Sequence, residues 1–246
     1  MANIVVLTGA GISAESGIPT FRDSHGLWEE HRIEDVASHI GWKRNPELVW
    51  NFYKKRQEAL LSVQPNRAHY VLVELEQYAN ENGHDFCIVT QNIDGLHQKA
   101  GSKKVIELHG DLKKLRCETC GHIDESESKW GEKEIPICPS CGDYLRVNVV
   151  WFGELLIESY INEAILKSDN ANIFLIIGTS GQVYPAASLV NYAFSNIATV
   201  IECNPEPAFA SYSMLNSPFY YCYRGKARTT VPLVVDEVIK KILNKK

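Results

Sequence analysis

Asn3-Ile4-Val5-Val6-Leu7-Thr8-Gly9-Ala10-Gly11 begins the chain with a short apolar run that ends in a glycine-rich turn. An apolar run of this length predicts a buried strand, and the glycines after it permit a tight turn into a helix. Such a turn lets a phosphate approach the backbone at the start of that helix. The spacing through Gly17 is G-x-G-x5-G rather than G-x-G-x-x-G. A turn with a purely structural role therefore stays an alternative.

Similar apolar runs recur along the chain and alternate with amphipathic stretches, which predicts an α/β fold with a parallel sheet. The candidate strands are Asn3–Thr8, Phe86–Thr90, Lys104–Leu108, Ile173–Ile177 and Ala198–Cys203. The segments that follow them are polar or rich in glycine: Gly9-Ala10-Gly11, Gln91-Asn92-Ile93-Asp94, His109-Gly110, Gly178-Thr179-Ser180 and Asn204-Pro205-Glu206. Because the carboxyl ends of parallel strands meet at one edge of a sheet, we expect these segments to line one shared cleft.

Two Cys-x-x-Cys pairs, Cys117/Cys120 and Cys138/Cys141, follow the third candidate strand. Their spacing is typical of a structural zinc site with four thiolate ligands. Two disulfides are the alternative, but the total of 7 cysteines is odd and no secretory signal precedes the first strand. Four thiolates leave no open position on zinc, so the metal is predicted to be structural. His109 is then available for another role, and His122 is the less favoured spare ligand.

Two stretches interrupt the alternation of strands and helices. Residues 29–65 are predicted to be helical and free of strands, and residues 111–148 hold the cysteines. We expect both to leave the main sheet and to pack together as a smaller helical and zinc-binding module. A discontinuous Rossmann-like domain then comprises residues 1–28, 66–110 and 149–246. A closing helix is expected over Val231–Lys245, with Pro232 near its start.

The composition is that of an ordinary soluble globular protein, with 246 residues, 45% of them hydrophobic and 22% charged. The net charge of −5 argues against nucleic acid as a partner. The longest strictly apolar run, Ile173–Ile177, is too short to cross a membrane. The cysteine pattern and the missing signal favour a reducing cytoplasm. The sequence does not determine the oligomeric state, and a monomer is consistent with it.

Some strand-end residues allow two interpretations. Asn92 and Asp94 could hold a carboxamide or ribose hydroxyls, or could form an Asx turn that caps the next helix. His109 could be a general base, because an ordinary histidine pKa of ~6.5 suits proton abstraction at neutral pH, or it could be structural. Phe21 and Arg22, in the loop after the glycine turn, are placed as a lid over a phosphate would be.

Taken together, these motifs resemble the sirtuins, which are NAD-dependent protein lysine deacylases. The resemblance extends from Ile4 to about Val235 and includes Gly9–Ser13, Ser16–Pro19, Phe21-Arg22, Thr90–Asp94, His109-Gly110, the four cysteines, Val150–Glu154 and Gly178–Ser180. It implies that an acyl group passes from lysine to ADP-ribose while nicotinamide is released. It also implies NAD as co-substrate and one structural Zn²⁺. The short length favours a prokaryotic member of the family.

The resemblance also implies roles for individual residues. His109 matches the catalytic base that acts on a ribose hydroxyl, and Asn92 and Asp94 match the residues that hold ribose and the carboxamide. Val150 and Phe152 match the walls of the acyl-lysine tunnel. The other cofactor-binding positions that it implies are Gly9, Ala10, Gly11, Phe21, Arg22, Trp28, Gln91, Ile93, Gly178, Thr179, Ser180, Asn204, Pro205, Glu206 and Ala227.

A finer feature is a Tyr-x-x-Arg pattern. Asn45-Pro46-Glu47 predicts a helix start, and in that helix Arg56 interrupts an apolar stripe while Tyr53 lies three residues before it. A pair of snorkelling surface side chains is the alternative. The pattern is similar to that of the class III sirtuin branch, where the pair binds the carboxylate of succinyl and malonyl groups. Thr20, Gly26-Leu27-Trp28 and the small Ala37 fit the same branch. The implied substrates are acyl-lysine proteins or peptides, with some deacetylation retained.

Two other functions remain as alternatives. An NAD-consuming hydrolase or ADP-ribosyltransferase would share the cofactor site without the deacylation. A zinc-ribbon module that binds nucleic acid or protein would explain the cysteines, but it predicts a basic face, and it leaves the strand-end motifs without a role.

Overall fold

The computed structural model describes residues 1–243 of the chain apart from 21–26, 29–30, 132–133, 210–213 and 215. Its main feature is a six-stranded parallel sheet with the order β11-β10-β9-β1-β4-β5. The chain first fills one side of β1 with β4 and β5, and later fills the other side with β9, β10 and β11. In an open sheet this reversal creates a crevice above the carboxyl ends of the strands where it occurs, here β1 and β9. The predicted α/β fold with a Rossmann-like sheet is confirmed.

The strands of this sheet agree closely with the sequence prediction. They are β1 (Asn3–Thr8), β4 (Asp85–Thr90), β5 (Val105–Glu107), β9 (Ile173–Ile177), β10 (Thr199–Asn204) and β11 (Tyr220–Arg224). The expected strands are present within one residue at either end. The additional strand, β11, lies at the edge of the sheet and is only partly buried, so its sequence lacks the aliphatic run that reveals a central strand.

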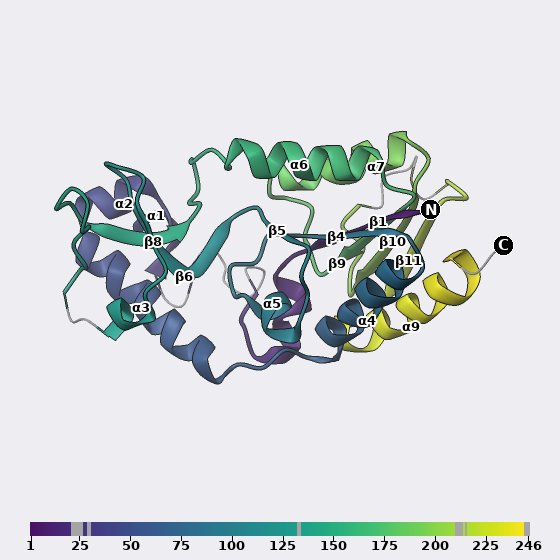
Figure 1. Ribbon diagram of the computed structural model, residues 1–246, viewed down its shortest axis with the longest axis horizontal. Helices are drawn as coiled ribbons and strands as arrows, with labels where there is room; N and C mark the ends of the chain where they lie inside the picture. Colours follow the sequence, from purple (N-terminus) through teal and green to yellow (C-terminus); the bar gives the residue numbers. More distant parts are fainter. Residues whose placement is uncertain (21–26, 29–30, 132–133, 210–213, 215, 244–246) are drawn as a thin grey trace.

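Helices cover both faces of the sheet (Figure 1). On one face lie α4 (Arg67–Glu81) and α9 (Ala227–Glu237), and on the other lie α6 (Glu158–Asp169) and α7 (Leu189–Ser195). Strand β1 shows why its sequence is apolar at every position: Ile4 and Val6 join the core with α4 and α9, whereas Val5 and Leu7 join the core with α6 and α7. The shorter elements near the sheet are α5 (Leu96–Ala100) and the 3-10 helices η1 (Ala10–Ile12), η2 (Ala14–Ser16) and η5 (Ala186–Ser188).

A second group of elements lies beside the sheet, on the left in Figure 1. It contains α1 (Ile33–Val36), α2 (His39–Arg44), α3 (Pro46–Ser62), the 3-10 helix η4 (Glu127–Gly131) and an antiparallel sheet of β6 (Gly110–Cys117), β7 (Ile123–Asp124) and β8 (Leu145–Val149). One hydrophobic core, drawn from residues 36–53 and 112–151, joins them. As predicted, α3 begins at Pro46, and the Asn45 side chain caps it by accepting from Leu48 N at 3.0 Å.

Two sequence predictions were wrong in detail. The stretch 29–65 is not free of strands, because β3 (His31–Arg32) pairs antiparallel with β2 (Leu27–Trp28); strands of two residues are too short to produce a sequence pattern. The closing helix starts at Ala227 rather than Val231, so Pro232 lies inside it, and a π-helix (Val238–Leu243) follows. Burial of Ala227, Val231 and Val234 at helical spacing outweighs the local cost of the proline. No helix among the described residues is long and apolar enough to cross a membrane.

Candidate functional site

The glycine-rich turn after β1 packs directly against the turn after β9. The amide of Gly11 donates to the carbonyl of Gly178 at 2.8 Å. A Cβ on Gly11 would lie 2.6 Å from Gly178 Cα, and a Cβ on Gly178, whose φ is +62°, would lie 2.4 Å from Ile12 N. Neither turn has room for a side chain at this contact. The glycines are therefore required for the approach of the two turns, whatever ligand they also face.

The expected helix after this turn is absent. The chain continues instead through the two short 3-10 helices η1 and η2. The amides of Gly9 and Gly11 already donate to Ile177 and Gly178 of the neighbouring turn, so they are not available at a helix start. The turn therefore opens two short 3-10 helices in place of the regular helix that was expected, and the approach of a phosphate to this turn stays a prediction.

Thr179 connects the segments that follow β4, β9 and β10. Gln91 Nε2 donates to Thr179 Oγ1 at 2.9 Å, and Asn204 Nδ2 donates to the Thr179 carbonyl at 2.7 Å. Asn204 Nδ2 also donates to the carboxylate of the buried Glu202 at 2.9 Å. Both of these Asn204 partners only accept, which fixes the amide orientation. The side-chain oxygen of Asn204 is thus the atom that can accept from a ligand hydroxyl.

His109 is held in the form that a general base requires. Its Nδ1 lies 3.0 Å from the Gln91 carbonyl, which only accepts, so Nδ1 carries the proton and Nε2 is the basic nitrogen. Burial lowers the pKa of His109, although the Gln91 carbonyl partly opposes this. The imidazole is therefore neutral at pH 7 and able to take up a proton.

Asn92 and Asp94 form hydrogen bonds with the glycine-rich turn after β1 and with Ser13, which follows it. Asp94 accepts from Ser13 Oγ at 2.7 Å through one oxygen and from Leu96 N at 2.9 Å through the other. Asn92 Nδ2 donates to the Gly9 carbonyl at 3.2 Å. The second Asp94 contact is the Asx turn that the sequence left open, and the first ties the turn after β4 to the turn after β1. Burial raises the pKa of Asp94.

Two buried histidines extend this network. His69 accepts from Asn66 N at 3.3 Å through Nδ1, so its Nε2 carries the proton and faces Ser13 Oγ at 3.5 Å. His97 lies 5.1 Å from His69 between ring centroids and pairs with Thr8 Oγ1 at 3.0 Å. Sequence reasoning did not single out either histidine. The spacing of Asn66 and His69 at the start of α4, where they form a capping box, was the available signal.

Most of the predicted substrate residues are linked through the segment Val150–Phe152, which begins beside His109. Val150 N donates to the His109 carbonyl at 2.9 Å, and Phe152 N donates to the Ala37 carbonyl at 3.1 Å. Phe152 is 53% exposed, as a wall of an open tunnel would be. Tyr53 is buried on α3, and its hydroxyl accepts from Trp151 Nε1, between the two walls, at 2.9 Å.

The Arg56 side chain lies on the same helix as Tyr53. Its guanidinium carbon is 5.4 Å from the centroid of the Phe52 ring, and the residue is half-buried. This position is deeper than that of a surface side chain whose head group extends into water.

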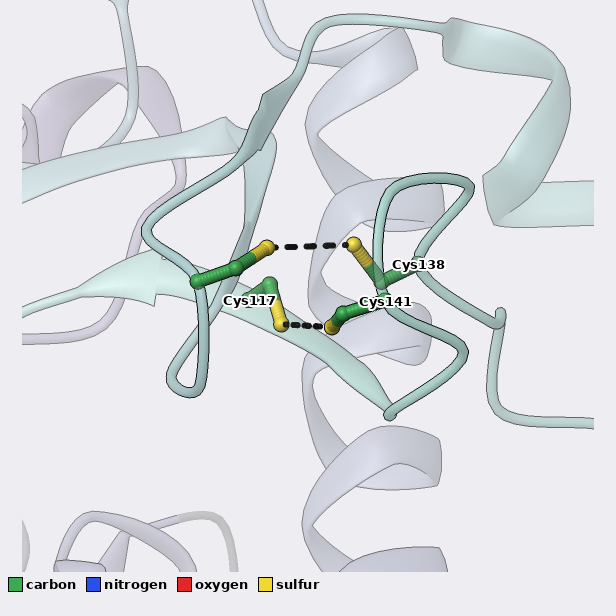
Figure 2. Close-up of side chains that lie close together, drawn as sticks. Cys117, Cys138 and Cys141 are labelled. Carbon is green, nitrogen blue, oxygen red and sulfur yellow. Dashed lines mark hydrogen bonds between the residues drawn. The ribbon is translucent and has the colours of Figure 1, made fainter.

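The four cysteines form one cluster (Figure 2). The Sγ atoms of Cys117 and Cys141 are 3.5 Å apart, those of Cys120 and Cys138 are 3.6 Å apart, and all four lie within 4.8 Å of one another. A disulfide would need about 2.05 Å, whereas two thiolates on one tetrahedral zinc lie about 3.8 Å apart. Free thiols at this spacing fit a Zn²⁺ ion, as the sequence predicted.

The remaining predicted cofactor residues are distributed around the same edge. Ile93 accepts from Leu112 N at 3.1 Å, Ala227 is buried at the start of α9, and Pro205 and Glu206 are exposed after β10. Ala10 and Ser180 are half-buried in their turns. Phe21 and Arg22 lie outside the described residues, as does the side chain of Trp28.

Comparison with known proteins identifies the protein family of this chain. The family model described as the Sir2 family matches residues 9–185. A protein of Aquifex aeolicus named NAD-dependent protein deacylase is 50% identical over 205 residues, which is 83% of this chain and 84% of that protein. The NAD-dependent protein deacylase SIR2rp3 of Leishmania major is 47% identical over 249 residues and covers 98% of both chains.

The chain belongs to the Sir2 family.

Solved Sir2 structures agree with the fold of this family member. A Sir2 homolog in complex with NAD is 40% identical, has a TM-score of 0.85 and covers 96% of this chain and 89% of that one. The structure of Sir2Tm bound to a propionylated peptide is 32% identical, has a TM-score of 0.78 and covers 95% and 92% of the two chains.

The cysteine geometry leads to a prediction about the metal. Replacing one ligand of this Sir2 protein, in Cys141→Ser, should lower the zinc content, lower the melting temperature and abolish activity indirectly, because four thiolates hold the module together. Cys222→Ser, a half-buried cysteine outside the cluster, is the matched control and should change none of these. Full activity and unchanged melting after stoichiometric zinc removal would contradict the structural role.

A second prediction concerns acid stability. Burial lowers the pKa of His69 from 6.5 to about 4. As the pH falls, His69 therefore takes up a proton in the unfolded chain before it does so in the folded protein. The contribution of neutral His69 to the free energy of unfolding is complete above pH 6.5, and roughly 3 kcal/mol of it is lost as the pH falls to 4.

Urea unfolding between pH 7 and pH 4 should show a flatter pH dependence for His69→Gln, whose side chain can still accept from Asn66 N. His84→Gln, at the opposite end of the sheet, is the control and should retain the dependence of the unmodified protein. Identical curves for His69→Gln and the unmodified protein would contradict the assignment.

Proposed function

We propose that this protein is an NAD-dependent protein lysine deacylase that removes succinyl and malonyl groups in preference to acetyl. The observation that carries the deacylase proposal is the position of His109. Its neutral imidazole lies among the strand-end segments, and its carbonyl binds Val150 of the predicted acyl-lysine wall. A base that lies next to both the predicted cofactor segments and the predicted acyl-lysine wall suits a reaction in which an acyl group passes from a lysine to a sugar hydroxyl.

The relatives support the same activity. Those described above carry the name NAD-dependent protein deacylase, and solved Sir2 structures hold NAD or a propionylated peptide. Another, Sir2Af2, is described as bound to a myristoylated histone peptide. We therefore propose acyl-lysine peptides or proteins as the substrates of this chain.

The strand-end residues have distinct roles in this proposal. When bound, NAD supplies the nicotinamide leaving group and the ADP-ribose acceptor for the acyl group. The Asn204 oxygen would accept from a ribose hydroxyl at the adenosine end, and the turns at Gly9–Gly11 and Gly178–Ser180 would face the phosphates. Asn92 and Asp94 would hold the nicotinamide end, and the basic Nε2 of His109 would accept a proton from a sugar hydroxyl. Phe21, Arg22, Trp28, Gln91, Ile93, Pro205, Glu206 and Ala227 complete the proposed pocket.

The proposed acyl preference rests on Tyr53 and Arg56. They lie one turn apart on α3, and Tyr53 contacts Trp151 between the tunnel walls Val150 and Phe152. A guanidinium with an adjacent hydroxyl offers a carboxylate one charge-assisted and one neutral hydrogen bond. The carbonyl of Ala37 accepts from Phe152 N. The methyl side chain of Ala37 is small and leaves space for a longer acyl group.

We also propose that the chain is divided into a domain and a module, as expected from the sequence. Residues 1–28, 66–110 and 149–246 form the NAD-binding domain, and residues 29–65 and 111–148 form a module that faces the substrate. The hydrophobic core that joins residues 36–53 to residues 112–147 supports this division, and Val149 and Trp151 extend that core across the boundary. A reducing cytoplasm is the proposed compartment, because the metal site needs thiolates.

The acyl preference predicts the behaviour of Arg56→Met. Loss of the guanidinium should lower kcat/KM for a succinyl-lysine peptide by roughly 10- to 150-fold, the value of one charge-assisted hydrogen bond, and should change acetyl-lysine turnover far less. Lys55→Met, on the exposed side of the same helix, is the matched control. Steady-state rates on both peptides provide the measurement. An unchanged succinyl-to-acetyl ratio in Arg56→Met would refute the preference.

The base assignment predicts the behaviour of His109→Tyr. Removal of a general base should reduce deacylation by roughly 10²- to 10⁴-fold with zinc content and melting temperature retained. Chromatographic measurement of nicotinamide and O-acyl-ADP-ribose provides the readout and also distinguishes deacylation from plain NAD hydrolysis. Appreciable formation of O-acyl-ADP-ribose by the variant would show that another group is the base.

A further inference from the structure

Arg146 of β8 is a fully buried arginine that contacts Trp151 and the residues around it. Its guanidinium carbon lies 3.8 Å from the centroid of the Trp151 ring, and one terminal nitrogen donates to the Val149 carbonyl at 3.0 Å. Another binds the carboxylate of Glu154, which in turn accepts from Trp151 N at 2.9 Å. Burying an arginine is costly unless its charge and donors are satisfied, and here they are satisfied by groups that also fix Trp151.

Trp151 transmits this constraint to the predicted acyl pocket. Its indole N–H donates to the Tyr53 hydroxyl at 2.9 Å, and the two rings lie 6.3 Å apart with 28° between their planes. Indole nitrogen is a donor only, so Tyr53 must accept from it. The O–H of Tyr53 is therefore directed away from Trp151 and acts as a donor toward other groups. A carboxylate has no proton and can bind this hydroxyl only as an acceptor, so a donating Tyr53 is compatible with an acidic acyl group.

Glu118 ties the same arginine to the zinc site. It lies between Cys117 and Cys120 in the first knuckle, and its carboxylate binds Arg146 Nε at 2.7 Å. A continuous series of contacts thus runs from the knuckle through Arg146 and Trp151 to Tyr53.

The carboxylates of this series do not form a second metal site. His39, Glu118 and Glu154 are close enough to ligate an ion. However, both carboxylates already bind the Arg146 guanidinium, and Glu154 also binds Arg116 at 3.2 Å. A further cation at this position would be repelled by two guanidinium groups.

We propose that Trp151 and Arg146 are positioning residues for acyl selectivity: Arg146 fixes the indole, the indole orients the Tyr53 hydroxyl toward an acidic acyl group, and Glu118 anchors Arg146 to the zinc knuckle. The inference rests on the proposed role of Tyr53 and Arg56 in binding the acyl carboxylate. It adds two residues that do not touch the carboxylate and a physical route by which the zinc site supports specificity.

The test compares Trp151→Phe with Trp50→Phe in the zinc-loaded protein. Phenylalanine retains an aromatic ring at position 151 and removes only the indole donor. Trp50 is a matched control, because it lies on the same helix as Tyr53, is equally buried, and its Nε1 has no hydrogen-bond partner among the described residues. We expect Trp151→Phe to lower kcat/KM for a succinyl-lysine peptide roughly 5- to 20-fold, mainly by raising KM. Acetyl-lysine kcat/KM and the KM for NAD should stay within about twofold.

Glu118→Gln tests the zinc end of the series without removing a ligand. It should lower the succinyl-to-acetyl ratio in the same direction by a smaller factor, while zinc content remains one ion per chain. Lys114→Gln, which breaks an exposed ion pair with Glu125 in the same sheet, should change neither quantity.

The outcomes separate the two proposals. If Arg56→Met lowers the succinyl-to-acetyl ratio but Trp151→Phe does not, the positioning role is overturned and the proposed function stands. If Arg56→Met leaves the ratio unchanged, the acyl preference fails and the positioning role fails with it. Equal losses on both peptides, or an equal effect of Trp50→Phe, would show general damage to the module and would also overturn the inference.

Discussion

The contact between the turn after β1 and the turn after β9 is the constraint on which the site depends. Gly11 and Gly178 approach so closely that a Cβ on either would collide with backbone. This approach brings the strand ends on the two sides of the topological reversal into one surface. Thr179 then reaches Gln91 and Asn204, and Asn92 reaches Gly9. A side chain at either glycine would separate the two halves of the sheet edge.

The polar groups beneath this contact must be satisfied because water does not reach them. Ser13 donates to Asp94 and faces the protonated nitrogen of His69, so each hydroxyl and carboxylate has a defined direction. Such a network is rigid as long as His69 and His97 stay neutral. Burial lowers the pKa of both histidines and so keeps them neutral near pH 7. The orientation of Asn92 and Asp94 is therefore a property of the fold, established before any ligand arrives.

The sequence predicted the parts of the molecule whose causes are local. Strand β1 is apolar at each position because both of its faces are buried, and the cysteine knuckles have a spacing set by the tetrahedral zinc shell. Parallel strands also place their following segments at one edge, which anticipated the contacts of Gln91 with His109 and Thr179. The 3-10 turns after Gly11 could not be anticipated, because they result from the contact with Gly178, which is more than 160 residues away in the chain.

Other features escaped prediction for similar reasons. Nothing local marks Arg146 as fully buried, since its partner Glu118 lies 28 residues away in the other cysteine knuckle, and Trp151 and Glu154 reach it only after the chain turns beyond β8. His97 likewise lies on an ordinary helical segment until α4 brings His69 beside it.

The sheet edge and the module that contains the four cysteines hold different kinds of groups in fixed orientations. The sheet edge fixes backbone and amide groups, which suits a large ligand that is the same in every turnover. The module fixes the Tyr53 side chain through Trp151, and in the function proposed above this suits discrimination between acyl groups of different charge. An acidic acyl group loses water when it is buried, and this cost is offset only where a guanidinium and an oriented hydroxyl replace that water. A hydroxyl that is free to rotate would offset less of the cost, so on this proposal the rigidity transmitted from Arg146 through Trp151 would itself contribute to selectivity.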